Sequence, residues 1–169
     1  RFARLFQGAA LFDSMTVFDN IAFPLREKLR LSIPDVSKRV EEKIEQVGLV
    51  GMGHKYPAEL SGGMRKRAGL ARALVMEPEI ILFDEPTTGL DPLMVKTIHD
   101  LIVAMQHQFG FTAVMVSHEI PAIFPISDWV AMLKEGTIAA MAPSSDFQRI
   151  QDPFIREFIT VGGTVPVGV

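Results

Sequence analysis

The stretch EIILFDEPTTGLDP, residues 79–92, determines the fold that we expect for this chain. Its apolar residues 80–83 do not alternate with polar ones, which is typical of a short β-strand covered on both faces. Pro92 suits the first position of a helix, expected over residues 92–109. A second unbroken apolar run, TAVMVS at residues 112–117, follows that helix. Strand, helix and strand in this order predict a parallel α/β sheet with right-handed crossovers.

Before this stretch, the sequence predicts one strand end and then helices. Residues 1–7, RFARLFQ, have the composition of a strand that is ending, and the apolar stretch after Gly8 should be partly helical until Pro24 stops it. An amphipathic helix is expected over residues 34–47, and Gly48 stands where a C-cap glycine belongs. The apolar positions of that helix recur at intervals of four, four and three: Val36, Val40, Ile44 and Val47.

The last third of the chain is expected to contain a hairpin and a tail. DWVAMLKEGTIAAMA, residues 128–142, has the pattern of two strands joined at a Glu-Gly pair. Pro121 and Pro125 should kink or shorten a helix that follows His118. The final stretch VGGTVPVGV, residues 161–169, has too little side-chain bulk to pack and is expected to be mobile.

The composition narrows the class of protein. Apolar residues make up 48% of the 169 residues and charged residues 22%, as in an ordinary globular protein. The formal net charge of −3 provides no broad cationic surface to neutralise a nucleic-acid backbone, so nucleic acid is not an expected partner. No apolar run reaches the about 18 residues of a membrane span. The absence of cysteine excludes disulfides and thiolate metal sites.

Two adjacent carboxylates follow the strand of the opening stretch. Because open parallel sheets present ligand sites at the carboxyl ends of their strands, Asp84 is placed to hold Mg²⁺ and Glu85 to orient and polarise an attacking water. A solvated turn is the competing interpretation of an Asp-Glu pair. His118 ends the next strand, where it would contact a γ-phosphate beside the carboxylates, although such a histidine is more often an ordinary surface residue.

A serine and two glycines precede a basic helix in LSGGMRKRAGLARAL, residues 60–74. Ser61 is a natural N-cap for a helix that runs to about Met76, and the amides at its start can meet an anion. The basic residues of this helix are expected to form a solvated face rather than a specific anion site: Arg65, Lys66, Arg67 and Arg72.

Together these motifs resemble those of the ATP-binding-cassette (ABC) ATPases, in the same order: LFQ as the glutamine loop, LSGGM as the signature, ILFDEPTTGLDP as Walker B and D-loop, and VSHE with the switch histidine. The resemblance implies an ABC-type P-loop NTPase fold, an α/β fold with a mostly parallel sheet core and an inserted α-helical signature subdomain, its first strands missing. It implies four parts: strand end and glutamine loop (1–8), helical signature subdomain (9–76), RecA-like core (77–160) and flexible tail (161–169).

The resemblance also assigns roles around a bound nucleotide. Gln7 would sense Mg²⁺ and the attacking water while linking the core to the helical subdomain. Asp84 would be the Walker B aspartate that holds Mg²⁺, Glu85 the catalytic glutamate and His118 the switch histidine. The cofactors implied are ATP and Mg²⁺.

A second set of residues would act across a homodimer. Ser61, Gly62 and Gly63 match the signature residues that contact the γ-phosphate of a nucleotide bound by the other subunit. Asp91 matches the D-loop aspartate that communicates between the subunits. Each nucleotide would then be held between one subunit's Walker motifs and the other's signature.

One expected motif is absent from these residues. The Walker A loop, G-x-x-x-x-G-K-[ST], which the family places before the glutamine loop, does not occur, so the chain taken alone is expected to be inactive. An upstream part missing from the sequence is the economical explanation, because Glu85 and His118 are intact. A non-catalytic half-module is the alternative, and a soluble cassette ATPase of translation or DNA repair is a further one.

A narrower resemblance rests on Met64 and on LFQGAALFDSMTVFDNIAFPLRE, residues 5–27. This combination is similar to the ATPases of Mla/Mce-type lipid transporters, also called organic-solvent or toluene tolerance systems. It implies ATP hydrolysis that energises phospholipid transport between bacterial membranes and maintains outer-membrane lipid asymmetry. The protein would be peripheral, on the cytoplasmic face of the inner membrane, with a permease and an Mce-domain substrate-binding protein as partners.

A dense apolar segment follows the glutamine loop. It could be core of the helical subdomain, or it could form the groove that receives a permease helix, and the sequence leaves both open. The large apolar residues concerned are Phe12, Met15, Val17, Phe18, Ile21 and Phe23.

Overall fold

The computed structural model describes residues 1–163, and these form two compact units, the first being Arg1–Val116 and the second beginning at Ser117. Residues 9–76, expected as a helical subdomain, belong to the same unit as the first strands. Helix α3 (Gly62–Leu74) contacts both strand β1 (Phe2–Leu5) and helix α1 (Val17–Lys28), so the helices and strands of this unit share one core. The four expected parts of the chain stay a prediction.

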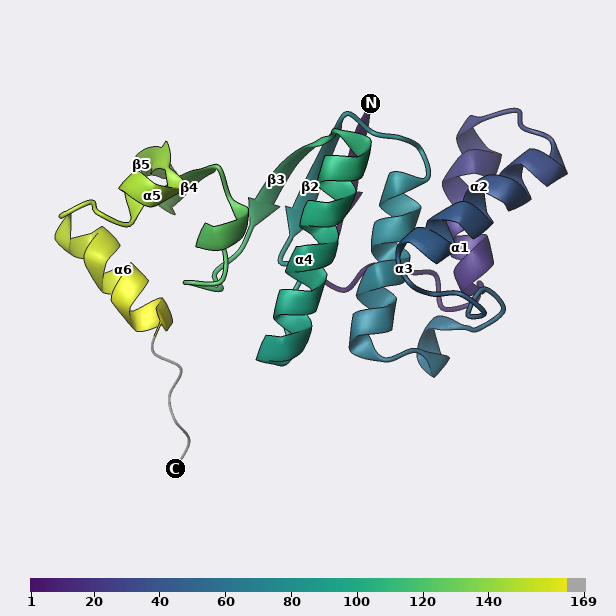
Figure 1. Ribbon diagram of the computed structural model, residues 1–169, viewed down its shortest axis with the longest axis horizontal. Coiled ribbons are helices and arrows are strands. Elements are labelled where there is room, and N and C mark those ends of the chain that lie inside the picture. The colour runs from purple at the N-terminus through teal and green to yellow at the C-terminus, as the bar shows by residue number, and fades with distance from the viewer. Residues whose placement is uncertain (164–169) are drawn as a thin grey trace. The chain divides into compact units, whose positions relative to one another are not determined.

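The first unit is built on a three-stranded parallel sheet in the order β1-β2-β3, which confirms the predicted parallel α/β sheet. Strand β2 (Ile80–Asp84) lies in the middle, with β1 on one side and β3 (Thr112–Val116) on the other. The connections through α3 and α4 (Pro92–Phe109) are long helices, and in Figure 1 both helices begin at the end toward which the strands point.

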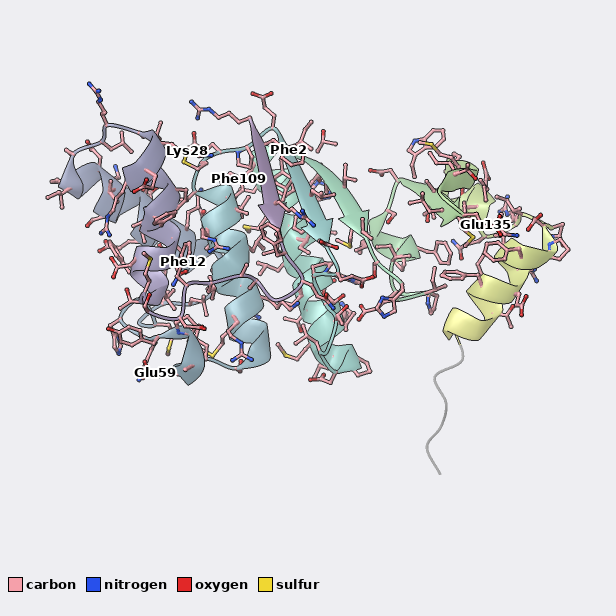
Figure 2. The ribbon with its side chains drawn as sticks, turned by 180° about the vertical axis from the view of Figure 1, so that it is seen from behind. Phe2, Phe12, Lys28, Glu59, Phe109 and Glu135 are labelled. Atoms are coloured by element: carbon pink, nitrogen blue, oxygen red, sulfur yellow. The ribbon has the colours of Figure 1, made fainter. Side chains whose placement is uncertain are left out.

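Within the first unit, helices cover only one face of this sheet. Ile81 and Phe83 are completely buried on the covered face, whereas Phe2 is 65% exposed and Val114 48% exposed on the other. Figure 1 shows α4 in front of the strands, and Figure 2, seen from behind, shows Phe2 at the start of β1 on the opposite side. The prediction that the strands are covered on both faces is therefore wrong within the first unit.

Helix α1 runs through Pro24 to Lys28, so the prediction that Pro24 stops it is wrong. A proline inside a helix costs about 3 kcal/mol, because it removes one backbone hydrogen bond and crowds the preceding turn. Ile21 and Leu25 are both completely buried, and burial of each large aliphatic side chain contributes about 1.5–3 kcal/mol. Packing of this helix face offsets the local cost of the proline.

The other helices of the first unit begin and end near the predicted residues. α2 (Ile33–Gln46) is followed by Gly48 in the left-handed conformation, and a short 3₁₀ helix, η1 (Pro57–Glu59), comes before α3. α4 begins at Pro92 and ends at Phe109, and its C-cap, Gly110, has a φ of 68°. Capping residues and glycines thus fixed these boundaries as the sequence predicts.

The second unit contains a short 3₁₀ helix η2 (Phe124–Ile126), the antiparallel hairpin β4 (Trp129–Lys134) and β5 (Thr137–Pro143), and helices α5 (Ser144–Phe147) and α6 (Pro153–Gly163). The hairpin confirms the prediction, since Glu135 and Gly136 both have positive φ, as a two-residue hairpin turn requires.

The second unit differs from the sequence prediction after His118 and at the start of the expected tail. The helix expected after His118 does not form, because Pro121 and Pro125 lie within a few residues of each other and leave only turns and η2. α6 includes the first three residues of the expected tail, and residues 164–169 lie outside the described residues. Within the described part of the chain, no helix combines the length and apolarity needed to cross a bilayer.

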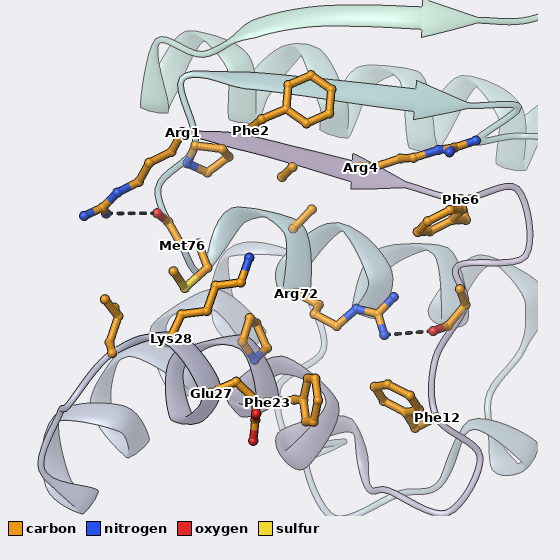
Figure 3. A pocket seen from close by; sticks show the side chains of 16 residues that line it. Arg1, Phe2, Arg4, Phe6, Phe12, Phe23, Glu27, Lys28, Arg72 and Met76 are labelled. Atoms are coloured by element: carbon orange, nitrogen blue, oxygen red, sulfur yellow. Dashed lines mark hydrogen bonds between the residues drawn. The ribbon is translucent and has the colours of Figure 1, made fainter.

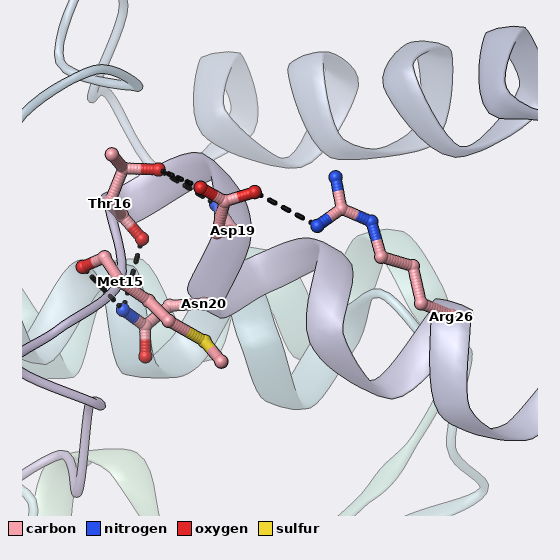
Figure 4. Close-up of polar contacts among 5 residues, drawn as sticks. All are labelled: Met15, Thr16, Asp19, Asn20 and Arg26. Atoms are coloured by element: carbon pink, nitrogen blue, oxygen red, sulfur yellow. Dashed lines mark hydrogen bonds and ion pairs between the residues drawn. The ribbon is translucent and has the colours of Figure 1, made fainter.

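Asn20 holds the segment before α1 in place, as Figure 4 shows. Its side chain is completely buried and donates to the backbone oxygens of Phe12, Met15 and Thr16, at 3.0–3.1 Å. Its oxygen accepts the N–H of Phe12 at 2.7 Å. Buried polar groups of this kind are costly to leave without partners, so Asn20 fixes the conformation of residues 12–16.

We expect Asn20→Ala to lower the free energy of unfolding by about 2–4 kcal/mol, because it removes these bonds together. Denaturant unfolding measures the loss. Arg26→Ala is the matched control, since Arg26 makes an exposed ion pair with Asp19 in the same helix and its loss should cost under about 1 kcal/mol. Equal stability of the two variants would contradict the role given to Asn20.

Candidate functional site

The carboxyl end of β2 carries the two predicted acidic residues. Asp84 is the last residue of the strand, and the N–H of Glu85 donates to the carbonyl oxygen of Val116 at 2.9 Å, which ties Glu85 to the end of β3. The Glu85 carboxylate accepts a bond from Thr88 Oγ1 at 3.0 Å. Both acids therefore have positions set by the sheet and by the turn that follows it.

Glu85 has a φ of 48°, in the left-handed region that a residue with a side chain seldom adopts. Such a conformation costs about 1–2 kcal/mol relative to the right-handed one. Strained backbone of this kind persists where the surrounding structure over-determines it, and it concentrates at functional sites. This conformation, together with the bonds to Val116 and Thr88, holds Glu85 in a defined position and makes it a candidate for the general base.

Asp84 has a partner that the sequence did not reveal. Arg4 Nη2 lies 2.5 Å from Asp84 Oδ2, and the Arg4 guanidinium carbon lies 4.5 Å from the centre of the Phe6 ring. Arg4 pairs in register with Leu82, two residues before Asp84, so Arg4 and Asp84 share one face of the sheet. The available signal was a single cation inside the otherwise apolar segment FARLF.

Gln7 lies in a turn directly after β1, and basic side chains of α3 hold the backbone of that turn. Lys66 Nζ donates to the carbonyl oxygen of Gln7, and the Arg72 guanidinium donates to those of Ala9 and Ala10 at 2.8 Å each. Ala9 and Ala10 both have positive φ, so the turn is strained as well as bonded.

The prediction that the basic residues of α3 form a solvated face is therefore wrong. Lys66 is only 7% exposed, and burial lowers the pKa of Arg72. Arg67 Nη1 donates to the carbonyl oxygen of Val47, and Arg65 Nη1 to that of Leu60. Unpaired backbone carbonyls in loops need donors, and long cationic side chains reach them.

The signature residues stand at the start of α3. Ser61 is the N-cap, and its Oγ accepts the N–H of Met64 at 3.3 Å. A Cβ added at Gly63 would lie 2.3 Å from Met94 Cε, and one added at Gly62 would lie 3.4 Å from Leu90 Cδ2. The glycines thus allow the start of α3 to pack closely against the start of α4.

Asp91 is the N-cap of α4, and its Oδ1 accepts the N–H groups of Leu93 and Met94 at 3.0 Å each. The structure therefore assigns this carboxylate a local capping role. The role in communication between subunits stays a prediction.

The first unit places the predicted residues in two groups. Gln7, Asp84 and Glu85 lie at or just after the carboxyl ends of neighbouring strands, whereas the signature residues and Asp91 stand at the starts of α3 and α4. His118 belongs to the second unit, where its carbonyl oxygen accepts the N–H of Ile120 at 3.0 Å. Its expected place beside the carboxylates stays a prediction.

The carboxylates at Asp84 and Glu85 suit a Mg²⁺ ion that takes its other ligands from phosphate and water. Among the described residues, no group of three or more acids or histidines could enclose a metal ion. Mg²⁺ in nucleotide sites is commonly bound through one or two carboxylates, with phosphate oxygens and waters as its other ligands. The Asp84 carboxylate, with Glu85 beside it, is suited to such a shared site.

Residues 1–88 match the sequence model of the ABC transporter family. The chain belongs to this family. It is 42% identical over 168 residues to the intermembrane phospholipid transport system ATP-binding protein MlaF of Escherichia coli K12, a match that covers 98% of this chain and 62% of that protein. The chain thus spans less than two thirds of this relative.

Two further comparisons place the chain within the family. It is 41% identical over 168 residues to the probable ribonucleotide transport ATP-binding protein mkl of Mycobacterium tuberculosis H37Rv, covering 99% of this chain and 47% of that protein. The ATP-binding cassette MJ0796, solved as a dimer in a post-hydrolysis state with ADP and Pi, matches with a TM-score of 0.75. That match has 30% identity and covers 85% of this chain and 63% of that one. The ABC-type α/β fold is thereby established.

Gly69 determines how closely α3 approaches the turn after β1. A Cβ added there would lie 2.8 Å from Leu5 Cδ1 and 2.9 Å from the Ala9 Cβ, and both residues are buried. The glycine therefore permits a contact that any side chain would push apart.

We expect Gly69→Ala to destabilise the protein by about 1–2 kcal/mol, although alanine is the better helix former by about 1 kcal/mol, because overpacking costs about 1–3 kcal/mol. Thermal and denaturant unfolding measure the difference. Gly8→Ala serves as the control, since an added Cβ there meets nothing within 4 Å. If Gly69→Ala instead raises the stability, the neighbouring Leu5 and Ala9 can move aside at no cost, and the predicted overpacking is wrong.

Proposed function

We propose that the protein is the ATP-hydrolysing subunit of an ABC transporter that moves phospholipid between bacterial membranes. The observation that carries the proposal is Glu85, held in a strained conformation directly after Asp84 at the carboxyl end of β2. Membership of the family and 42% identity to a phospholipid transport ATPase support it.

Hydrolysis in this proposal is mainly a matter of position and charge. Mg²⁺ supplies positive charge that neutralises the phosphates of ATP, and Asp84 is the residue that would hold it. Glu85 orients the attacking water and accepts its proton. The hydrogen bond from its backbone N–H to Val116 fixes the position of the main chain from which the carboxylate extends. Gln7 and His118 complete the set as the residues that sense the metal, the water and the γ-phosphate.

The signature residues act on a nucleotide of a second copy of the chain. The N–H groups at the start of the 13-residue helix α3, with Ser61 as its N-cap, form a site for an anion. Homodimerisation is the means by which Ser61, Gly62 and Gly63 reach a γ-phosphate, and Asp91 lies at the neighbouring helix start. The similar cassette MJ0796 is itself dimeric.

We expect Glu85→Gln in the intact gene product to lower ATP hydrolysis by about 100-fold or more and to trap an ATP-bound dimer, because the amide cannot accept the proton of water. Phosphate release and gel filtration with ATP measure the two effects. Glu79→Gln, the same change at the opposite end of β2, should leave both unchanged. Normal turnover in the Glu85 variant would reject the assignment.

A groove beside the glutamine loop suits the permease. It has a volume of about 890 Å³, lies between β1, α1 and α3, and is seen from close by in Figure 3. The rings of Phe12 and Phe23, with centres 5.0 Å apart, form an apolar wall, while Val17 and Ile21 are buried core. Burial thus separates the core residues of this segment from those that line the groove, and we propose the permease role for the second set.

The charges of the groove indicate which partner segment fits. Its cationic lining residues outnumber the one acid, Glu27. We propose that an amphipathic helix of the permease binds here, with apolar side chains toward the phenylalanines and an acidic side chain toward the cations. The cations that line the groove are Arg1, Arg4, Lys28 and Arg72.

We expect Phe12→Asp to reduce copurification of the permease by about tenfold or more, because it places a carboxylate against the apolar face of the bound helix. ATP hydrolysis by the subunit alone should stay unchanged. Val50→Asp, at a residue 70% exposed and outside the groove, is the control. If both variants lose permease copurification equally, the groove is not the binding site.

In the cell, we propose, the subunit works in a complex at the inner membrane. An Mce-domain protein delivers the phospholipid, the complex maintains outer-membrane lipid asymmetry, and the subunit is peripheral on the cytoplasmic face of the inner membrane. Ribonucleotide is the competing cargo, because a relative at 41% identity carries that name. Reconstitution of the complex in liposomes tests this, since phospholipid and not ribonucleotide should stimulate ATP hydrolysis.

A further inference from the structure

We propose that Arg4 is a positioning residue that holds the Asp84 carboxylate when no metal is bound, and that it must release this carboxylate before Mg²⁺ can bind there. The inference rests on the proposed function only in taking Asp84 as the residue that holds the metal. It assigns to Arg4 control over how tightly the site binds a divalent cation.

The geometry of the sheet places the two side chains together. Arg4 lies on β1 and Asp84 on the neighbouring strand β2, on the same face, and Nη2 donates to Oδ2 at 2.5 Å. That face is the one that the helices of the first unit leave uncovered. Both side chains are partly exposed, at 44% and 32%, so either can exchange its partner without opening the core.

A second contact determines where the guanidinium can go. The guanidinium carbon of Arg4 lies 4.5 Å from the centre of the Phe6 ring, a favourable distance for a cation over an aromatic face. Arg4 and Phe6 both line the groove beside the glutamine loop, and Figure 3 shows both side chains there. The guanidinium therefore keeps one partner, the Phe6 ring, when it leaves Asp84.

Two cations cannot share the carboxylate at no cost. A guanidinium and a divalent ion repel each other at a few ångströms, and each is attracted by the same acceptor oxygens. If Arg4 must be displaced, the metal binds more weakly, and the loss equals the free energy of the ion pair between Arg4 and Asp84. Binding of metal and the position of Arg4 are thus linked, and removal of the guanidinium should tighten metal binding.

The test measures Mn²⁺ as a probe for Mg²⁺, by the electron paramagnetic resonance of free Mn²⁺, in the intact gene product with saturating ADP. We expect Arg4→Gln to lower the Kd for Mn²⁺ by about threefold to fivefold, the range for removing a partly exposed ion pair. Arg4→Lys keeps the charge and should stay close to the parent. Arg26→Gln removes an ion pair elsewhere and should change nothing.

Asp84→Asn separates failure of this inference from failure of the proposed function. If that variant loses Mn²⁺ binding while Arg4→Gln binds as the parent does, or more weakly, the inference about Arg4 is overturned and the metal role of Asp84 stands. If Asp84→Asn binds Mn²⁺ normally, the proposed metal site is wrong. Should Arg4→Gln fail to fold, Arg4→Met takes its place, because a long apolar side chain fills the same position beside Phe6.

Discussion

The contact between the basic side chains of α3 and the backbone of the turn after β1 is the constraint on which the first unit depends. Lys66 and Arg72 reach carbonyl oxygens of Gln7, Ala9 and Ala10, in a turn that has left the β-ladder and that contains two alanines with positive φ. Without these donors, partly buried carbonyls would lack partners. The same contact fixes the signature helix relative to the strand that ends at the glutamine loop.

This arrangement places carboxylates and the N–H groups of helix starts at the same end of the first unit. Strands deliver carboxylates at their carboxyl ends, and the connecting helices, which run back along the sheet, present their N–H groups at the same end (Figure 1). A cation with its phosphates is suited to the first group, and a phosphate alone to the second. The order strand, helix, strand therefore determines where the candidate site residues lie and how they are divided into two groups.

Local signals in the sequence were sufficient wherever a boundary depends on one residue. Ser61, Pro92, Gly48 and Gly110 mark helix ends through capping and φ, and Gly136 marks the hairpin. The failures involve contacts between distant residues. Burial of α1 overrides Pro24, the carbonyls that bind the cations of α3 lie up to 63 residues away, and Arg4 meets Asp84 only because their strands are neighbours. Residue patterns along one segment carry no information of this kind.

The turn after β1 has a further consequence for how the protein tolerates sequence change. Its acceptors are main-chain oxygens, which every amino acid possesses, whereas its donors are particular side chains. Substitutions at the exposed positions Gly8 and Ala10 leave the acceptors in place, but each change at Lys66 or Arg72 removes a donor outright. Variation among related proteins should thus accumulate in the exposed part of the loop, while the helix that holds it stays nearly fixed.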